Sequence, residues 1–113
     1  MTAFDELDRG DVIWGTDPLS DTGRPMLVVG APRFPSHGVQ LITALVSTKT
    51  YHDDAIKLRD RDYVGEPLGE RSHVLPWSLA TLDNPTTVDE YLTSLVEDRT
   101  DDVATRTIGY LSA

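Results

Sequence analysis

Short apolar segments, separated by glycine, proline and aspartate, recur at intervals of about ten residues through the first two thirds of the chain. Segments of this length are typical of β-strands. The expected strands are 11–14, 25–29, 39–46, 55–58, 73–77 and 79–82. Short strands at this spacing favour a small barrel or sandwich over a parallel sheet.

Beyond Pro85 the apolar residues recur with the period of an α-helix. They are Val88, Tyr91, Leu92, Leu95 and Val96. Thr87, followed three positions later by Glu90, fits a capping box, in which each side chain satisfies a backbone donor of the other residue. A second helix is expected after Thr100, where Asp101 and Asp102 would complement the positive end of its dipole.

A chain of 113 residues is the size of a single domain. We therefore predict one domain over 1–113, strand-rich over 9–82 and helical over 86–112. Its fold class would be mainly β with C-terminal helices. Cysteine is absent, which excludes disulfides, zinc sites built from cysteine and thiol nucleophiles.

The sequence contains no apolar stretch of the roughly 20 residues that a membrane span needs. Its first ten residues carry several acids where a signal peptide needs a cationic start. We therefore expect a cytoplasmic protein that does not associate with a membrane.

The net charge is −9, from 19 acidic and 10 basic residues. Such a charge discourages nucleic-acid binding, which depends on neutralising phosphates. However, the acids are mostly aspartate and the cations almost all arginine, a bias that resembles the proteins of salt-loving archaea. In molar salt an acidic surface keeps a protein soluble, so the charge would reflect a halophilic solvent and not the ligand. An ordinary acidic protein is the alternative.

Acidic residues are absent from 22–52, which makes this segment the one most tolerant of an anion. It contains Arg24, Arg33, Lys49 and His52, besides His37. The glycine loops that bind nucleotides and the common hydrolase motifs do not occur in the chain. The three histidines lack the spacing of metal ligands, so we expect no metal and no cofactor.

The remaining candidates for chemistry are Arg24 at the start of one strand and Ser47, Thr48 and Lys49 at the end of another. A guanidinium suits phosphate because it offers a fixed, bidentate cation. Two alternatives stay open: Arg24 forms only a surface ion pair with Asp17 or Asp21, and the two hydroxyl residues simply end a strand.

Two stretches of the sequence carry a family resemblance. The residues Arg9-Gly10-Asp11-Val12-Ile13-Trp14, followed after a loop by Gly23-Arg24-Pro25-Met26-Leu27-Val28-Val29, resemble the opening of the MazF/PemK family of toxin–antitoxin ribonucleases. Ala44-Leu45-Val46-Ser47-Thr48 is similar to its third-strand motif, and 72–82 resembles a later strand pair of haloarchaeal members.

This resemblance implies a small, closed, SH3-like antiparallel barrel with a C-terminal helix, which commonly forms a homodimer. It also implies metal-independent cleavage of single-stranded RNA to 2′,3′-cyclic phosphate and 5′-hydroxyl ends, and an antitoxin protein as partner. The catalytic residues would be Arg24 and either Thr48 or Ser47. Trp14, Arg33, Lys49 and His52 would contact the RNA, with the indole stacking on bases. The alternative for Trp14 is a place in the core, which is the commoner role of tryptophan in a small barrel.

The alternative function is a catalytically inactive barrel. The loop 15–23 lacks the Glu-Gln-Gly pattern frequent in active members of the family, and only one arginine precedes Pro25. Such a barrel would act as a DNA-binding, RNA-binding or protein-binding module in transcriptional regulation.

Overall fold

The computed structural model describes residues 3–49 and 53–113, and the fold is mainly β with one C-terminal α-helix. Six strands form one antiparallel sheet in the order β6-β7-β5-β2-β1-β8, and β3 and β4 form a separate hairpin. The strands are β1 (Asp11–Asp17), β2 (Thr22–Gly30), β3 (Arg33–Phe34), β4 (Gly38–Val39), β5 (Leu41–Ser47), β6 (Ile56–Lys57), β7 (His73–Leu82) and β8 (Val88–Ser94).

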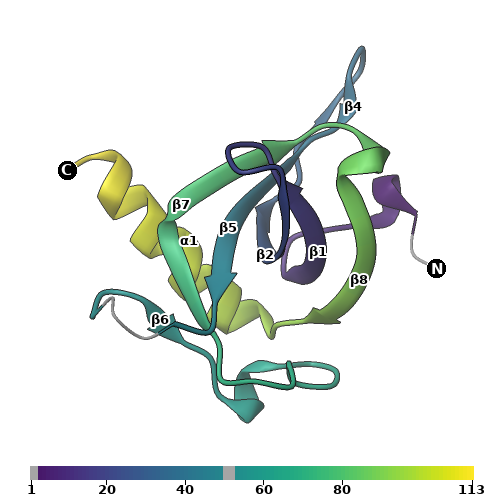
Figure 1. Cartoon of the computed structure of the whole chain (residues 1–113). Coiled ribbons are helices and arrows are strands. Elements are labelled where there is room, and N and C mark those ends of the chain that lie inside the picture. The colour runs from purple at the N-terminus through teal and green to yellow at the C-terminus, as the bar shows by residue number, and fades with distance from the viewer. Residues whose placement is uncertain (1–2, 50–52) are drawn as a thin grey trace.

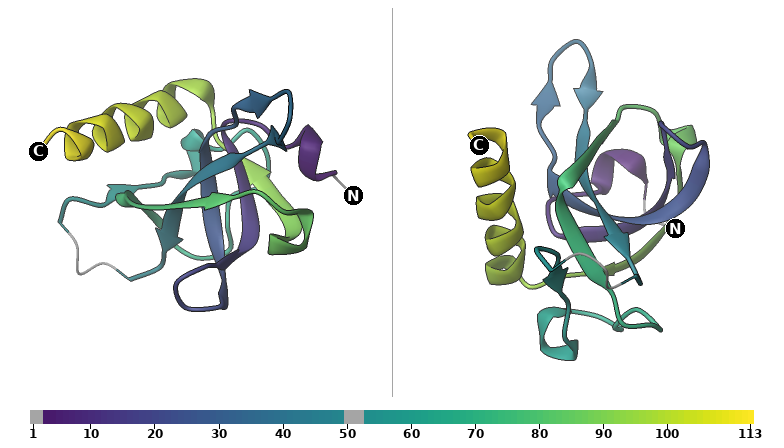
Figure 2. Two further views of the ribbon diagram at one scale, coloured as in Figure 1. Left: turned by 90° about the horizontal axis from the view of Figure 1, so that it is seen from above. Right: turned by 60° about the vertical axis from the view of Figure 1, so that its left-hand side comes forward.

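The helix α1 (Glu97–Leu111) packs chiefly on β7, on the outside of a strongly curved sheet (Figures 1 and 2). Three short 3₁₀ turns complete the elements: η1 (Phe4–Glu6), η2 (Asp60–Asp62) and η3 (Pro85–Thr87). In the part of the chain that the structure describes, no helix is long and apolar enough to cross a membrane.

The two edges of the sheet approach each other through the segment that follows β6. Tyr63 forms an antiparallel bridge with Leu95, just after β8. The amide of Val64 donates to the carbonyl of Ser94 at 2.8 Å, and the amide of Val96 donates to the carbonyl of Asp62 at 2.8 Å. The chain therefore connects the β6 side of the sheet to the β8 side by backbone hydrogen bonds.

The core consists of two apolar clusters, one on each face of the sheet. Val12 and its cross-strand partner Leu27 belong to the cluster that includes Val103 of α1. Ile13 and its partner Met26 belong to the other. Successive residues of a strand point to opposite faces, so β1 and β2 are buried on both sides. This explains why they are nearly continuous apolar runs in the sequence.

The predicted helix over 88–96 is wrong, because Val88–Ser94 forms strand β8 beside β1. The register between the strands shifts twice, once between Val12 and Ile13 and once between Trp14 and Gly15. Such bulges break the alternation of a regular strand, and the resulting apolar spacing imitates a helix. The predicted capping box is likewise absent: Thr87 ends a 3₁₀ turn, and its hydroxyl donates to the carbonyl of Asn84.

The other strands also differ from the expected bounds: β1 and β2 are longer than expected, and β6 is shorter. The segments 73–77 and 79–82 form the single strand β7, in which the partner of Leu45 is Leu75 and that of Ala44 is Leu79. The three residues between those partners bulge out of the pairing, and Pro76, which lacks a backbone N–H, is one of them. The segment 39–46 is divided at Gln40 between β4 and β5. The second predicted helix begins earlier than expected, at Glu97.

Candidate functional site

An open groove with a volume of about 770 Å³ brings together residues that are far apart in the sequence. Five of the predicted site residues line this groove, and so do residues that the sequence did not suggest. The five are Trp14, Arg24, Ser47, Thr48 and Lys49. We call it the Arg24 groove, and its defining residues are Trp14, Gly23, Arg24, Ser47, Thr48 and Lys49. They come from β1, β2 and β5, three neighbouring strands of the sheet, and from Thr48 and Lys49 just after β5.

Strand pairing places Arg24 beside Ser47. In the antiparallel pair of β2 and β5, Met26 lies opposite Leu45. Extending this register by two residues places Arg24 opposite Ser47, on the same face, and leaves Thr48 in the alternate position. Ser47 Oγ accepts a hydrogen bond from the amide of Lys49 at 3.1 Å, and so shapes the turn, while the Thr48 side chain is exposed.

Arg24 forms the ion pair with Asp17 that the sequence left open as an alternative. Its Nε lies 3.6 Å from Asp17 Oδ2 and makes no hydrogen bond, although the atom is buried. The other oxygen of the carboxylate, Oδ1, accepts from the amide of Leu19 at 2.9 Å in the β1–β2 turn. Because the Arg24 side chain is 43% exposed, this pair contributes little to stability. Its main effect is to orient a guanidinium whose two Nη atoms form no hydrogen bond within the described part of the chain.

Trp14 is an aromatic wall of the Arg24 groove. Its side chain is 38% exposed, and the indole lies directly over the backbone of Gly23. Its partner in β2 is Pro25 and its partner in β8 is Glu90, and both also line the groove. An exposed, supported ring of this kind offers a surface for stacking a planar ligand.

The structure does not bring every predicted residue to the groove. Arg33 lies in the β3–β4 hairpin, where its Nη2 donates to the carbonyl of Asp5 at 2.7 Å. It is not among the residues that line the groove. His52 lies outside the described residues. No cluster of three or more histidine, aspartate or glutamate side chains suited to a metal occurs in residues 3–49 and 53–113.

The sequence missed the contribution of Gly23, Glu70 and Glu90 to the groove. Glu90 was assigned to a helix cap, and only the pairing of β8 with β1 places it beside Trp14. Glu70 comes from the loop before β7, whose position has no local sequence pattern. Gly23 lies inside β2, and a glycine within a strand often marks the close approach of another group.

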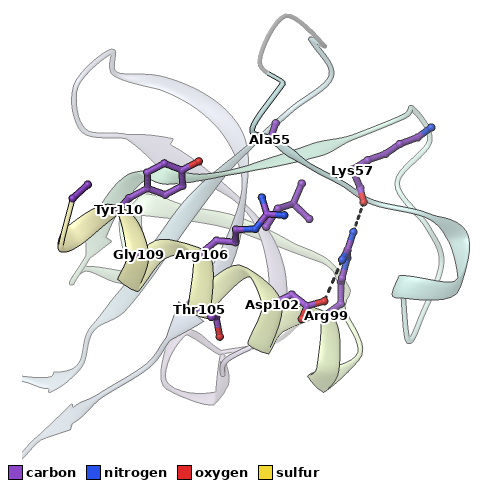
Figure 3. Close-up of a pocket in the computed structure, with 10 residues that line it drawn as sticks. Ala55, Lys57, Arg99, Asp102, Thr105, Arg106, Gly109 and Tyr110 are labelled. Carbon is purple, nitrogen blue, oxygen red and sulfur yellow. Dashed lines mark hydrogen bonds and ion pairs between the residues drawn. The ribbon is translucent and has the colours of Figure 1, made fainter.

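A second pocket, also of about 770 Å³, lies between β6 and α1 (Figure 3). Residues that line it form contacts between the helix and β6. The guanidinium of Arg99 binds both β6 and its own helix at this pocket. Its Nη2 donates to the carbonyl of Lys57 at 2.8 Å, and its Nη1 lies 3.2 Å from Asp102 Oδ2. Its Nε lies 3.4 Å from a carboxylate oxygen of the buried Asp62. Arg106 also lines this pocket.

The Arg24 groove has the groups needed to bind a phosphodiester. It offers a guanidinium with unused donors, the hydroxyls of Ser47 and Thr48 among others, one lysine and an aromatic surface, besides the carboxylates of Glu70 and Glu90. Comparison of the sequence with models of known protein families and with curated proteins found no match.

Proposed function

We propose that this chain is a metal-independent endoribonuclease similar to the MazF/PemK toxins, which cleaves single-stranded RNA in the Arg24 groove. The observation that carries the proposal is that Arg24, Ser47, Thr48 and Trp14 all line one groove. The resemblance assigns catalysis to Arg24 and to Thr48 or Ser47, and the residue type of Trp14 suggests contact with RNA bases.

The fold is consistent with this proposal. We infer that the curved sheet is a small closed barrel of the SH3-like type, because the bridge between Tyr63 and Leu95 joins its two edges. In this arrangement the groove lies on the barrel surface at the ends of β2 and β5. A homodimer and an antitoxin protein are the partners that the same family resemblance implies.

In the proposed reaction the 2′-oxygen of a ribose attacks the adjacent phosphorus. The 2′-hydroxyl gives up its proton, the bond from phosphorus to the 5′-oxygen breaks, and that oxygen takes up a proton. The products are a 2′,3′-cyclic phosphate and a 5′-hydroxyl. The phosphoryl oxygens gain negative charge in the transition state, so a cation held beside them lowers the barrier.

Arg24 supplies that cation. A guanidinium stays protonated at all relevant pH values and is a poor base, so its role is electrostatic. The ion pair with Asp17 orients it and leaves both Nη atoms for the phosphate. A hydroxyl from Ser47 or Thr48 donates a further hydrogen bond. Lys49 contacts a neighbouring phosphate, and Trp14 stacks on a base.

The test is a cleavage assay in molar KCl with EDTA, using a long unstructured RNA and mapping the ends of the fragments. The wild type is compared with Arg24→Ala and with Arg61→Ala, a matched loss of an exposed arginine that does not line the groove. We expect discrete cuts with 2′,3′-cyclic phosphate ends in the wild type and in Arg61→Ala, and at least a roughly hundredfold loss of rate in Arg24→Ala.

Thermal unfolding of the three proteins is the control for folding. Equal cleavage by wild type and Arg24→Ala would assign the activity to another site or to a contaminant. RNA left intact by folded wild-type protein, over many sequences, would overturn catalysis. The catalytically inactive binding module in transcriptional regulation would then be the better description.

A further inference from the structure

The Arg24 groove carries a negative group beside its aromatic wall. Glu90 lies directly opposite Trp14 in the antiparallel pair of β8 and β1, so the two side chains share one face of the sheet. Both line the groove, and Glu90 is exposed. Its carboxylate forms no ion pair or hydrogen bond with any other residue in 3–49 and 53–113.

The order of the strands separates the groove into two ends. Lys49 follows β5 and Arg24 belongs to β2, whereas Glu90 belongs to β8, on the other side of β1. In the order of the strands Trp14 on β1 therefore lies between Lys49 and Glu90. Arg24 pairs with Gly15 and extends from the opposite face of β2, and Glu70 lines the groove from the loop before β7. A nucleotide that places a phosphate at Lys49 and its base on the indole would direct an edge of that base toward Glu90.

A carboxylate beside RNA is unfavourable unless it accepts hydrogen bonds, because it repels the phosphates. Its two oxygens accept and cannot donate, so they select base edges that carry donors. Guanine offers two adjacent donors, the N1–H and the N2 amino group, which match both oxygens of one carboxylate. Adenine and cytosine each offer an amino group, while the imino group of uracil lies between two carbonyl oxygens that a carboxylate repels.

We propose that Glu90 is a specificity-determining residue that reads the base stacked on Trp14 and favours guanine. This inference rests on the proposed RNA-binding function of the groove and adds the identity of a preferred base.

The test uses four pentanucleotides of 2′-O-methyl RNA that are uridine except for the central base, which is guanine, adenine, cytosine or uracil. Without a free 2′-hydroxyl they cannot be cleaved, so dissociation constants are measured at equilibrium by fluorescence anisotropy. The wild type should bind the guanine pentamer about tenfold or more tightly than the all-uridine pentamer, the range for one good bidentate contact.

Two variants separate the role of Glu90 from a general charge effect. Glu90→Gln should reduce the preference for guanine over uracil to about twofold, because one oxygen acceptor is replaced by a donor. Glu66→Gln removes the same charge at an exposed position that does not line the groove, and should keep the preference. A preference for guanine that survives in Glu90→Gln overturns the inference.

The outcomes also separate this inference from the proposed function. If the wild type cleaves long RNA but binds the four pentamers equally, the role of Glu90 is overturned and the ribonuclease proposal stands. If it cleaves no RNA but binds the guanine pentamer preferentially through Glu90, catalysis is overturned and the specificity stands. Absence of both binding and cleavage overturns both.

Discussion

The indole of Trp14 lies so close to Gly23 that the groove has no space for a side chain at position 23. A Cβ placed on Gly23 would overlap with Nε1 of the indole and lie 3.0 Å from its Cε2. The two residues are on neighbouring strands, where Trp14 pairs with Pro25 and Gly23 pairs with Thr16. The glycine therefore leaves the space that the indole occupies, on the face of β2 opposite to the Arg24 side chain.

Substitution of Gly23 by alanine should displace Trp14. We expect a shifted indole N–H resonance for Trp14, several-fold weaker binding of the pentamers, and a loss of about 1 kcal/mol in the free energy of unfolding. Gly69→Ala is the matched control, because Gly69 also lines the groove and a Cβ there meets nothing within 4 Å. Equal behaviour of the two variants would show that the contact with Gly23 does not position the indole.

Substitution of Asp17 by asparagine should strengthen RNA binding. It removes the negative charge 3.6 Å from Arg24 Nε, and the amide oxygen of the new side chain can still accept from the Leu19 amide. We expect KM to fall by about threefold at moderate salt, in the range for an exposed ion pair, with kcat within about twofold. Steady-state cleavage at two salt concentrations measures this. A fall in kcat of about tenfold would instead show that Asp17 has to hold Arg24 in place.

Much of the sheet follows from the sequence because its central strands are buried on both faces. The apolar runs around Val12, Leu27 and Val46 identify β1, β2 and β5 without any knowledge of their partners. The strand β8 could not be recognised in this way. It lies at the end of the sheet order, most of its residues are exposed or half-buried, and two bulges disturb its alternation.

The residues of the candidate site likewise fall into those that the sequence pattern reveals and those that it does not. Arg24, Ser47, Thr48 and Lys49 were detectable because they lie at the ends of recognisable strands in a segment free of acids. Glu90 was not, since its position beside Trp14 depends on the pairing of β8 with β1. Local pattern identifies residue types and strand ends, while the cross-strand neighbours that shape a groove depend on the long-range register.

Substitution of Arg99 by alanine should destabilise the attachment of α1 to the sheet. The guanidinium binds the carbonyl of Lys57 and faces the carboxylates of Asp62 and Asp102. Removing it leaves the buried carboxylate of Asp62 without a cation, so we expect a loss of about 2 kcal/mol in the free energy of unfolding. Denaturant unfolding measures this, with Arg61→Ala as the exposed control. A loss no larger than that of the control would show that the contacts of Arg99 contribute nothing to stability.

Tyr63 should make the stability of the protein depend on pH in the alkaline range. Burial raises the pKa of its phenol, a backbone hydrogen bond with Leu68 opposes the shift, and the charges of Asp62 and Asp60 raise it further. The folded state therefore favours the neutral phenol more than the unfolded state does. Its contribution to stability is fully present below the unfolded pKa of about 10 and is lost as the pH rises from there through the folded pKa.

The measurement compares the free energy of unfolding of wild type and Tyr63→Phe between pH 8 and pH 11, with Tyr110→Phe as a control at an exposed tyrosine. We expect the slope of stability against pH above about pH 10 to be smaller in Tyr63→Phe than in the other two proteins, because phenylalanine has no proton to lose. Absorbance at 295 nm should show one tyrosine of the folded wild type ionising late, and that component should be absent from Tyr63→Phe. Identical slopes in the three proteins would mean that Tyr63, at the bridge to Leu95, ionises without cost to the folded state.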